Sequence, residues 1–527
     1  MVAVGRRRWL VVVALVLVAG CTSGGGGGSG SGSGGGGGAP RGRSGGTLAI
    51  ALLDPGPLDP ARADHLEDEV VLGNLFDGLT AIDPAGAVRP AVAASWSSDP
   101  ALRRWEFRLR PDARWSDGSP VRSSDFSFAW QRLADPKASA GAAPAARALL
   151  SGVTGYRAFA TGRARTIAGL ETPDPATLIV RLGHPFADLP ALVAALPLSP
   201  LPAALVRPDP AAYLVRPVGN GPFRLAAPAR PGGALTLDRN PAYAGPPALL
   251  DKVSVRVVPD EQTAWLELQN GRAAFAPVPS DQLAAARTVH GSSADGRTRP
   301  GLLQGPALTT WNLAFNLKSK LGGNPSWRQA ASLAVDRDQL AATLAGTAAT
   351  TLVPRATPGW AAGAGPVCPA CDHDPAQARA LFAKAKAGRA PVTMAIPAGP
   401  EGRRIAAQVA ADLAAAGVAL KPTPAPKGET PLTLVRGVAP YPRPEPFLSG
   451  PSAAVPDARR LLDQARATPD DPTRATRYHQ AEATILADLA ATPLLTEHHA
   501  AVLTPGPQGV DLTPWGTLDL AAVSLPA

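Results

Sequence analysis

Short segments with two different hydrophobic periods alternate along most of this 527-residue chain. Residues 104–133 contain both, because Trp105, Phe107 and Leu109 first alternate with charged residues, as in a strand that buries one face. After a turn-forming stretch, apolar residues recur at helical spacing over 126–133. The pattern predicts a mixed α and β domain in which these aromatic side chains belong to the core.

Other segments support the same fold class. Residues 403–420 place apolar side chains on one helical stripe that ends at Gly417, a typical helix stop. Strand-like segments precede and follow this helix, which predicts a βαβ unit over 390–422. The other short alternating strands that we expect are residues 47–52, 177–182, 234–239 and 253–258.

The N-terminus has the order of a secretory signal followed by a lipid-attachment site. An arginine cluster precedes an apolar run from Trp9 to Val18, which is shorter than the about 20 residues of a membrane span. The ending "LVAGC" resembles the bacterial lipobox, and the alternative is a plain signal peptide that happens to end near Cys21. We therefore expect a signal peptide over residues 1–20 and lipidation of Cys21.

Residues 21–45 are rich in Gly and Ser and cannot bury enough apolar surface to fold. We expect a flexible tether here, and no later segment is long and apolar enough to span a membrane. The sequence thus predicts an extracytoplasmic protein that a lipid anchors to the cell membrane, at the cell surface or in the periplasm.

Composition and motifs do not indicate an enzyme or a nucleic-acid-binding protein. The formal net charge of +9 is not gathered into a basic run interleaved with aromatics, so no nucleic-acid partner is expected. The G-x-S-x-G match at residues 42–46 lies in the tether, and His498 and His499 lack the spacing of a helical metal site. We predict no catalytic residue, no metal site and no cofactor.

Cys368 and Cys371 form a C-x-x-C pair. With one His nearby, this pair is at best half of a zinc site. Outside the cytoplasm a local disulfide is the simpler interpretation, with free thiols and a bound metal as the alternatives.

Nine motifs, in their order and spacing, resemble the solute-binding proteins of the dipeptide/oligopeptide ABC-importer family. They include "GGTLAIALLDPGPLDPARA", "LGNLFDGLTAIDPAGAVRPAVAASW" and "VRPVGNGPFRL". No single motif is specific, but together they cover about 400 residues. The motifs lie at residues 45–63, 72–96, 104–133, 215–225, 237–245, 253–279, 313–317, 327–340 and 374–385.

The resemblance implies a two-lobed α/β fold of the periplasmic-binding-protein type, with an additional subdomain and crossover segments between the lobes. It implies lobe I at 46–305 with an inserted outer subdomain at about 85–175, lobe II at 306–492, and a return to lobe I at 493–527. It further implies that a monomer closes its lobes over a small peptide and delivers the peptide to the permease subunits and ATPases of an ABC importer.

Binding groups are expected on the crossover segments. Trp311 would stack on the ligand and Asn316 would hydrogen-bond to it, whereas core packing and a strand-end cap are the alternatives. Family members that bind peptides often hold the ligand's α-ammonium by a late Asp, and "GVAPYPRPEPF" retains only Tyr441 and Glu445 of that region. We therefore expect Glu445 to hold the ammonium and Arg443 to neutralise it or bind a carboxylate, unless both are solvated loop charges.

Departures from the family motifs keep other functions open. Arg272 and Ala274 stand where the family carries acidic residues, and the late region is short. The alternatives are a binder of another solute, such as an oligosaccharide or a metal chelate, in the same fold; a surface sensing or adhesion protein that has lost transport; and a hydrolase.

Overall fold

Residues 42–527 form one compact unit in the computed structural model. The predicted signal peptide, Cys21 and most of the predicted tether lie outside the described residues. The structure describes residues 44–526 except 64–65, 140, 143, 294–300, 345, 361–367, 387–389, 429, 511–512, 514 and 517.

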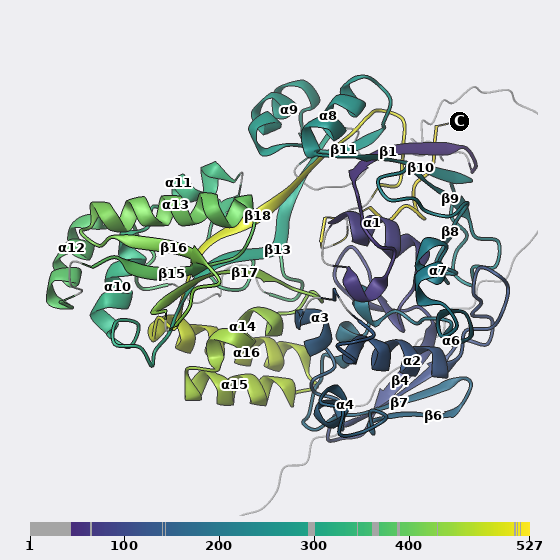
Figure 1. Cartoon of the computed structure of the whole chain (residues 1–527), viewed down its shortest axis with the longest axis horizontal. Helices are drawn as coiled ribbons and strands as arrows, with labels where there is room; N and C mark the ends of the chain where they lie inside the picture. Colours follow the sequence, from purple (N-terminus) through teal and green to yellow (C-terminus); the bar gives the residue numbers. More distant parts are fainter. Residues whose placement is uncertain are drawn as a thin grey trace, which may run out of the picture. The chain divides into compact units, whose positions relative to one another are not determined.

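A 12-stranded mixed sheet runs through this unit (Figure 1). Its main path is β16 (Leu420–Pro424), β15 (Val392–Ile396), β17 (Leu432–Val438), β13 (Gly301–Phe315), β18 (Ala491–Leu503), β11 (Phe275–Pro277), β1 (Thr47–Leu53), β10 (Lys252–Val258), β9 (Leu235–Arg239) and β8 (Phe223–Leu225). Two short strands, β12 (Ser292–Ser293) and β14 (Thr347–Ala348), pair with β13 and β18 off this path.

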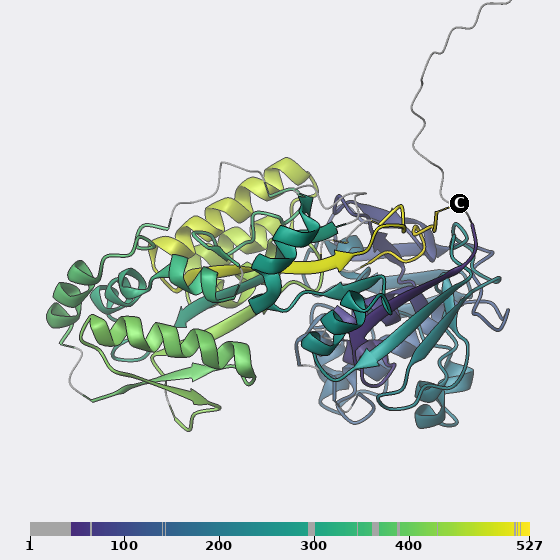
Figure 2. The same ribbon diagram turned by 90° about the horizontal axis from the view of Figure 1, so that it is seen from above.

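The long strands β13 and β18 belong to both halves of the sheet. They pair antiparallel with each other, and the register shifts between Pro306 and Thr310. On one side β18 pairs with β11, and on the other β13 pairs with β17. Figure 1 shows both strands between the two groups of elements, and Figure 2 shows β18, in yellow, running from one group to the other. We keep the names lobe I, subdomain and lobe II for the ranges proposed from the sequence.

In lobe I, β1 pairs in parallel with β10, and Ile50 is fully buried opposite Val255. The strands predicted at 47–52, 234–239 and 253–258 are confirmed as β1, β9 and β10. Helix α8 (Glu261–Gln269) contacts β11, α9 (Leu283–His290) contacts β13 and β18, and α1 (Leu66–Leu75) contacts β8 (Figure 1). The smaller elements are η1 (Pro60–Arg62), β2 (Thr80–Ile82), β3 (Val88–Pro90), α5 (Leu189–Leu192), η2 (Leu196–Leu198), α6 (Ala203–Val206), α7 (Pro210–Val215) and η3 (Ser280–Gln282).

A second sheet has four strands in the order β4 (Ala93–Ser98), β5 (Arg104–Leu109), β7 (Thr177–Arg181) and β6 (Leu170–Asp174). Strands β4, β5 and β6 lie within the range given to the subdomain, and β7 follows directly after it; we include β7 under that name from here on. Helix α2 (Ser123–Ala134) packs on β6 and β7, and α3 (Pro144–Ala148) and α4 (Tyr156–Ala160) contact α2. Phe107 and Phe126 are fully buried, which confirms the strand, the helix and the core role predicted for residues 104–133.

Lobe II covers its part of the sheet with helices. The predicted βαβ unit is confirmed, since β15 and β16 pair in parallel and α13 (Pro400–Ala415) connects them. Gly417 ends the helix region with a positive φ of 97°, a conformation that glycine adopts without strain. The other helices are α10 (Pro325–Ala334), α11 (Arg337–Thr343), α12 (Pro375–Lys384), α14 (Glu445–Ser452), α15 (Pro456–Arg466) and α16 (Asp471–Ala487).

Three observations bear on the cysteines, metals and membranes. Cys368 and Cys371 are joined by a disulfide in the core beside α16. Among the described residues, no three His, Cys, Asp or Glu side chains cluster in a way that could hold a metal ion. None of the described helices combines the length and hydropathy of a membrane-crossing segment.

Candidate ligand-binding site

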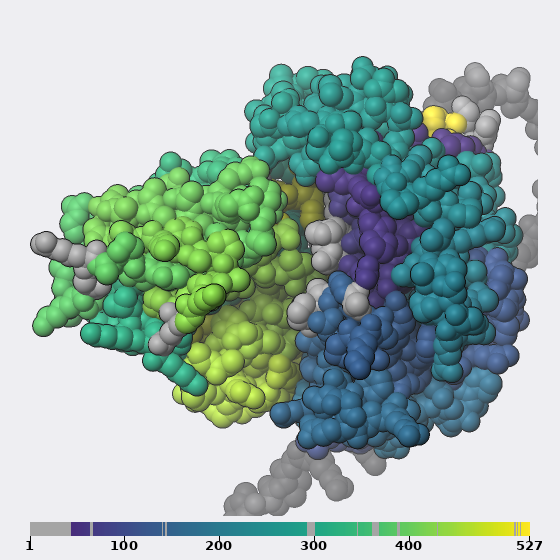
Figure 3. Space-filling model, viewed as in Figure 1, coloured from purple at the N-terminus to yellow at the C-terminus, as the bar shows by residue number. Residues whose placement is uncertain are grey.

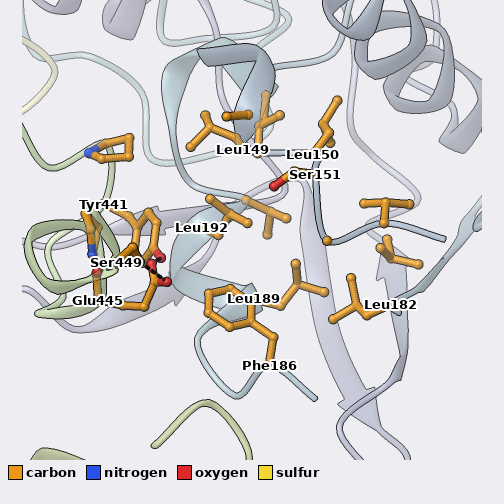
Figure 4. A pocket seen from close by; sticks show the side chains of 18 of the residues that line it. Leu149, Leu150, Ser151, Leu182, Phe186, Leu189, Leu192, Tyr441, Glu445 and Ser449 are labelled. Carbon is orange, nitrogen blue, oxygen red and sulfur yellow. Dashed lines mark hydrogen bonds between the residues drawn. The ribbon is translucent and has the colours of Figure 1, made fainter. Parts of the chain in front are cut away.

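A cavity of about 390 Å³ lies between the subdomain, the α5 region and α14 (Figure 4). Its volume falls within the range of ligand pockets, about 300–1,000 Å³. One wall comes from residues 145–153 and 180–198, and the other from residues 438–449 together with Arg466 of α15. Segments about 300 positions apart in the chain therefore build one site. In the space-filling view, the blue surface of the subdomain and the yellow-green surface of α14–α16 adjoin one another (Figure 3).

The wall from lobe I and the subdomain is mostly apolar, with Ser151 and His184 among its polar side chains. Strand β7 buries its first four residues and ends at the exposed Arg181. Leu182, the next residue, is buried and lines the cavity. Every residue of the short helix α5 is buried, and Leu189 and Leu192 line the cavity from it. Leu149 and Phe186 complete this side of the site (Figure 4).

The wall from lobe II carries a carboxylate and a guanidinium as well as two hydroxyl groups. Glu445 and Ser449 lie on one face of α14 because they are four residues apart, and Tyr441 precedes the helix. The Tyr441 hydroxyl donates to Oε2 of Glu445 at 2.6 Å, while Ser449 and Arg466 both donate to Oε1. Both oxygens of this carboxylate therefore have partners within the protein.

The charge of Glu445 is stabilised by these partners. Burial by itself would raise the pKa of this carboxyl, but the Arg466 guanidinium and the hydrogen bonds from Ser449 and Tyr441 more than compensate, and the net pKa lies below its usual range. Glu445 is thus ionised at neutral pH and paired with Arg466.

A second buried carboxylate, Asp188, lies next to the cavity. It accepts a hydrogen bond from Tyr478 at 2.9 Å, and Arg474 and Arg443 lie 3.2 and 3.5 Å from it. Burial raises the pKa of Asp188, and the two arginines oppose that rise. We call Asp188, Arg443, Arg474 and Tyr478 the Asp188 cluster. It joins a lobe I segment to lobe II, as does the bond from the Ala187 amide to the Arg466 carbonyl.

Of the five ligand-binding residues expected from the sequence, Tyr441 and Glu445 line the cavity. Arg443 is half-buried in the Asp188 cluster and donates to the carbonyl of Gly86 at 3.1 Å. Its acidic neighbour is Asp188, whereas the cation beside Glu445 is Arg466, so Arg443 does not have the role toward Glu445 that the sequence predicted. The region is also more regular than expected, because Glu445 begins α14 instead of lying in a loop.

Trp311 and Asn316 do not line this cavity. The Trp311 side chain is 1% exposed in the lobe II core, and its indole nitrogen donates to Glu497 at 2.6 Å. The Asn316 side chain accepts from the Lys318 amide at 3.1 Å, directly after β13. These contacts favour the two alternatives stated above, core packing and a strand-end cap.

Sequence reasoning did not find the apolar wall. Its only signal was a run rich in Leu, Ala and Pro over 186–202, which periodicity alone cannot distinguish from an ordinary core segment. Arg466 was also missed, since nothing in the sequence of α15 indicates that this arginine reaches Glu445.

Comparison with known proteins identifies the class. The family model described as bacterial extracellular solute-binding proteins, family 5 middle, matches residues 87–479. The chain therefore belongs to this family of binding proteins, and the resemblance to the peptide-importer binding proteins is confirmed.

Curated relatives share parts of the chain. It is 30% identical over 59% of its length to a probable deoxycholate-binding periplasmic protein, YgiS, of Escherichia coli strain K12, covering 57% of that protein. It is 33% identical over 36% of its length to the periplasmic oligopeptide-binding protein OppA of Haemophilus influenzae, covering 35% of it. The matches thus span between about a third and just over half of these relatives.

Solved structures confirm the two-lobed α/β fold. The murein tripeptide binding protein MppA of Escherichia coli has a TM-score of 0.74 at 23% identity, with 92% of this chain and 99% of that chain covered. Haemophilus influenzae OppA in complex with RPPGFSPFR has a TM-score of 0.73 at 21% identity, with 93% and 100% covered. At these identities the likeness concerns the fold.

Proposed function

We propose that this protein is an extracytoplasmic solute-binding protein that captures a small peptide and delivers it to the permease subunits of an ABC importer. The match of the family model over residues 87–479 carries this proposal. The names of the oligopeptide-binding and murein peptide-binding relatives support the ligand class. We further propose that it acts as a monomer, without catalysis, and held to the membrane by a lipid on Cys21.

The cavity suits such a role. Tyr441 and Glu445 come from lobe II, whereas Phe186 and Leu189 come from lobe I, so a ligand in the cavity contacts both lobes. A ligand that binds the closed arrangement better than an open one shifts the protein toward closure. Capture would then present a closed form to the importer.

A second candidate function is supported by the apolar lining. The relative named for deoxycholate binding suggests a ligand with a large apolar body and a carboxylate, and the cavity wall from Leu149 to Leu192 would suit that body. Here the fold and delivery to an importer stay the same, and only the solute differs.

Isothermal titration of the ligand-stripped protein separates the two functions. We expect heat of binding with peptides of two to five residues, with Kd in the range of about 1 µM or below, equivalent to about −8 kcal/mol. Binding of deoxycholate but of no peptide would favour the second function. Absence of binding by both would contradict the proposal.

A further inference from the structure

We infer that the cavity takes an uncharged, apolar end of the ligand, so that the protein prefers peptides with an acylated amino end over the same peptides with a free ammonium. This inference rests on the proposed function and names the kind of peptide that the site selects. It departs from the role that the sequence predicted for Glu445.

The first step concerns the acid at the cavity. Among the described residues that line it, Glu445 is the only carboxylate. Its oxygens already accept from Tyr441, Ser449 and Arg466, and the side chain is 12% exposed. A ligand ammonium would have to displace Arg466 or share its partner, and burying an ammonium without a partner of its own is costly.

The second step concerns the balance of charges around Glu445 and Asp188. Glu445 and Asp188 are two buried carboxylates, and Arg443, Arg466 and Arg474 are three guanidinium groups around them. The two further acids that touch this group, Asp463 and Asp471, have side chains exposed by 58% and 79%, so water screens them. Among the buried and half-buried groups the excess charge is therefore positive, which disfavours a further cation from the ligand.

The third step concerns what the cavity offers instead. Leu149, Leu182, Phe186, Leu189 and Leu192 present apolar surface on the opposite wall (Figure 4). An acyl group or a leucine-like side chain gains from leaving water there. The amide of an acylated amino end carries no charge, and the Tyr441 hydroxyl oxygen can accept a hydrogen bond from its N–H. The Ser449 oxygen already accepts from Arg466 at 3.3 Å.

The test compares acetyl-Leu-Ala-Ala with Leu-Ala-Ala by isothermal titration at pH 7. We expect the acetylated peptide to bind about tenfold or more tightly, as for a buried charge left without a partner. Glu445→Gln removes the acid and should keep the order of the two affinities. Tighter binding of the free peptide, lost in Glu445→Gln, would overturn the inference and leave the proposed function standing. Failure of both peptides would overturn the proposed function as well.

A second variant removes the guanidinium that pairs with Glu445. Arg466→Met leaves Glu445 without its cation. The affinity for the free-ammonium peptide should therefore rise about tenfold relative to the affinity for the acetylated peptide. The double variant Glu445→Gln with Arg466→Met leaves no unpaired charge at the cavity, because Asp463, the other acid that pairs with Arg466, is 58% exposed to water. It should restore the original preference, and it is measured instead if Arg466→Met alone does not fold. An unchanged preference in a folded Arg466→Met protein would contradict the assignment.

Discussion

Identical side chains acquire different properties from their surroundings in this protein. Glu445 has an arginine partner and stays ionised. Glu482 on α16 is fully buried, and its Oε1 accepts from the amides of Leu352 and Val353 at 2.6 and 3.0 Å. Its Oε2 has no hydrogen-bond partner among the described residues, and burial raises the pKa of Glu482 to about 7.

Glu482 should make stability depend on pH. The folded protein binds the proton of the Glu482 carboxyl more tightly than the unfolded chain does. The stabilisation that this proton gives to the folded state is therefore complete below pH 4.5 and is lost as the pH rises to about 7. Because each tenfold change in proton affinity is worth about 1.4 kcal/mol, the total is about 3 kcal/mol. Urea denaturation at several pH values should show that Glu482→Gln removes this loss, whereas Glu401→Gln at an exposed site does not. Equal pH dependence in all three proteins would contradict the assignment.

Residue types could be read from the sequence, but their partners could not. Trp311 was recognisable as an aromatic on a crossover strand, yet its partner Glu497 is 186 positions away. Glu445 was recognisable as the remaining acid of its region, but Arg466 reaches it from the next helix. Pairing of this kind is decided by how the elements pack, which one-dimensional periodicity does not contain.

Single helices and strands were predicted better than the contacts between them. The βαβ unit and residues 104–133 followed from local periodicity, because their buried faces repeat at strand or helix spacing. Helix α14 was missed, since its start is rich in proline. Proline is compatible with the first turn of a helix, where no intrahelical partner for its nitrogen is needed.

The Asp188 cluster should contribute to stability as a contact between elements of the two lobes. Asp188→Ala would leave Arg443 and Arg474 without their buried acid, and we expect a loss of about 3 kcal/mol of unfolding free energy. Asp457→Ala breaks the exposed pair with Arg460 and should cost under about 1 kcal/mol. Urea denaturation of the two variants measures both losses of unfolding free energy. Equal losses would show that the cluster does not hold these elements together.

The short loop before α12 carries a prediction about its cysteines. If Cys368 and Cys371 are paired in the purified protein, as in the structure, thiol titration of the folded chain without its N-terminus should find no free thiol. The ring is small, so reduction should lower stability by only about 1–2 kcal/mol. Two titratable thiols under oxidising conditions would contradict the pairing.

At the scale of the whole molecule, the order of the family motifs predicted the fold, whereas the composition did not. They implied the two-lobed fold, which the family match and the structural neighbours confirm. The cavity was not predictable, because the residues that line it, within 145–198 and 438–466, are far apart in the chain and lie together only in the folded molecule.

The anchor is also a property of the whole molecule. Lipidation is predicted from the apolar run and the "LVAGC" ending. Cys21→Ser should therefore release the protein into the medium or leave it unprocessed, as followed by membrane fractionation and the mass of the N-terminal fragment. Fractionation identical to that of the unaltered protein would refute a lipid on this cysteine.

The central claim, that the cavity between the subdomain and α14 is the ligand site, is tested most directly by blocking it. Ser151 is exposed and lines the cavity (Figure 4), whereas the exposed Ser124 on α2 does not. In titrations with the tightest peptide, Ser151→Trp should weaken binding by about tenfold or more, because the indole occupies ligand space. Ser124→Trp should change it by less than about twofold. Unchanged affinity in a folded Ser151→Trp protein would place the ligand site elsewhere.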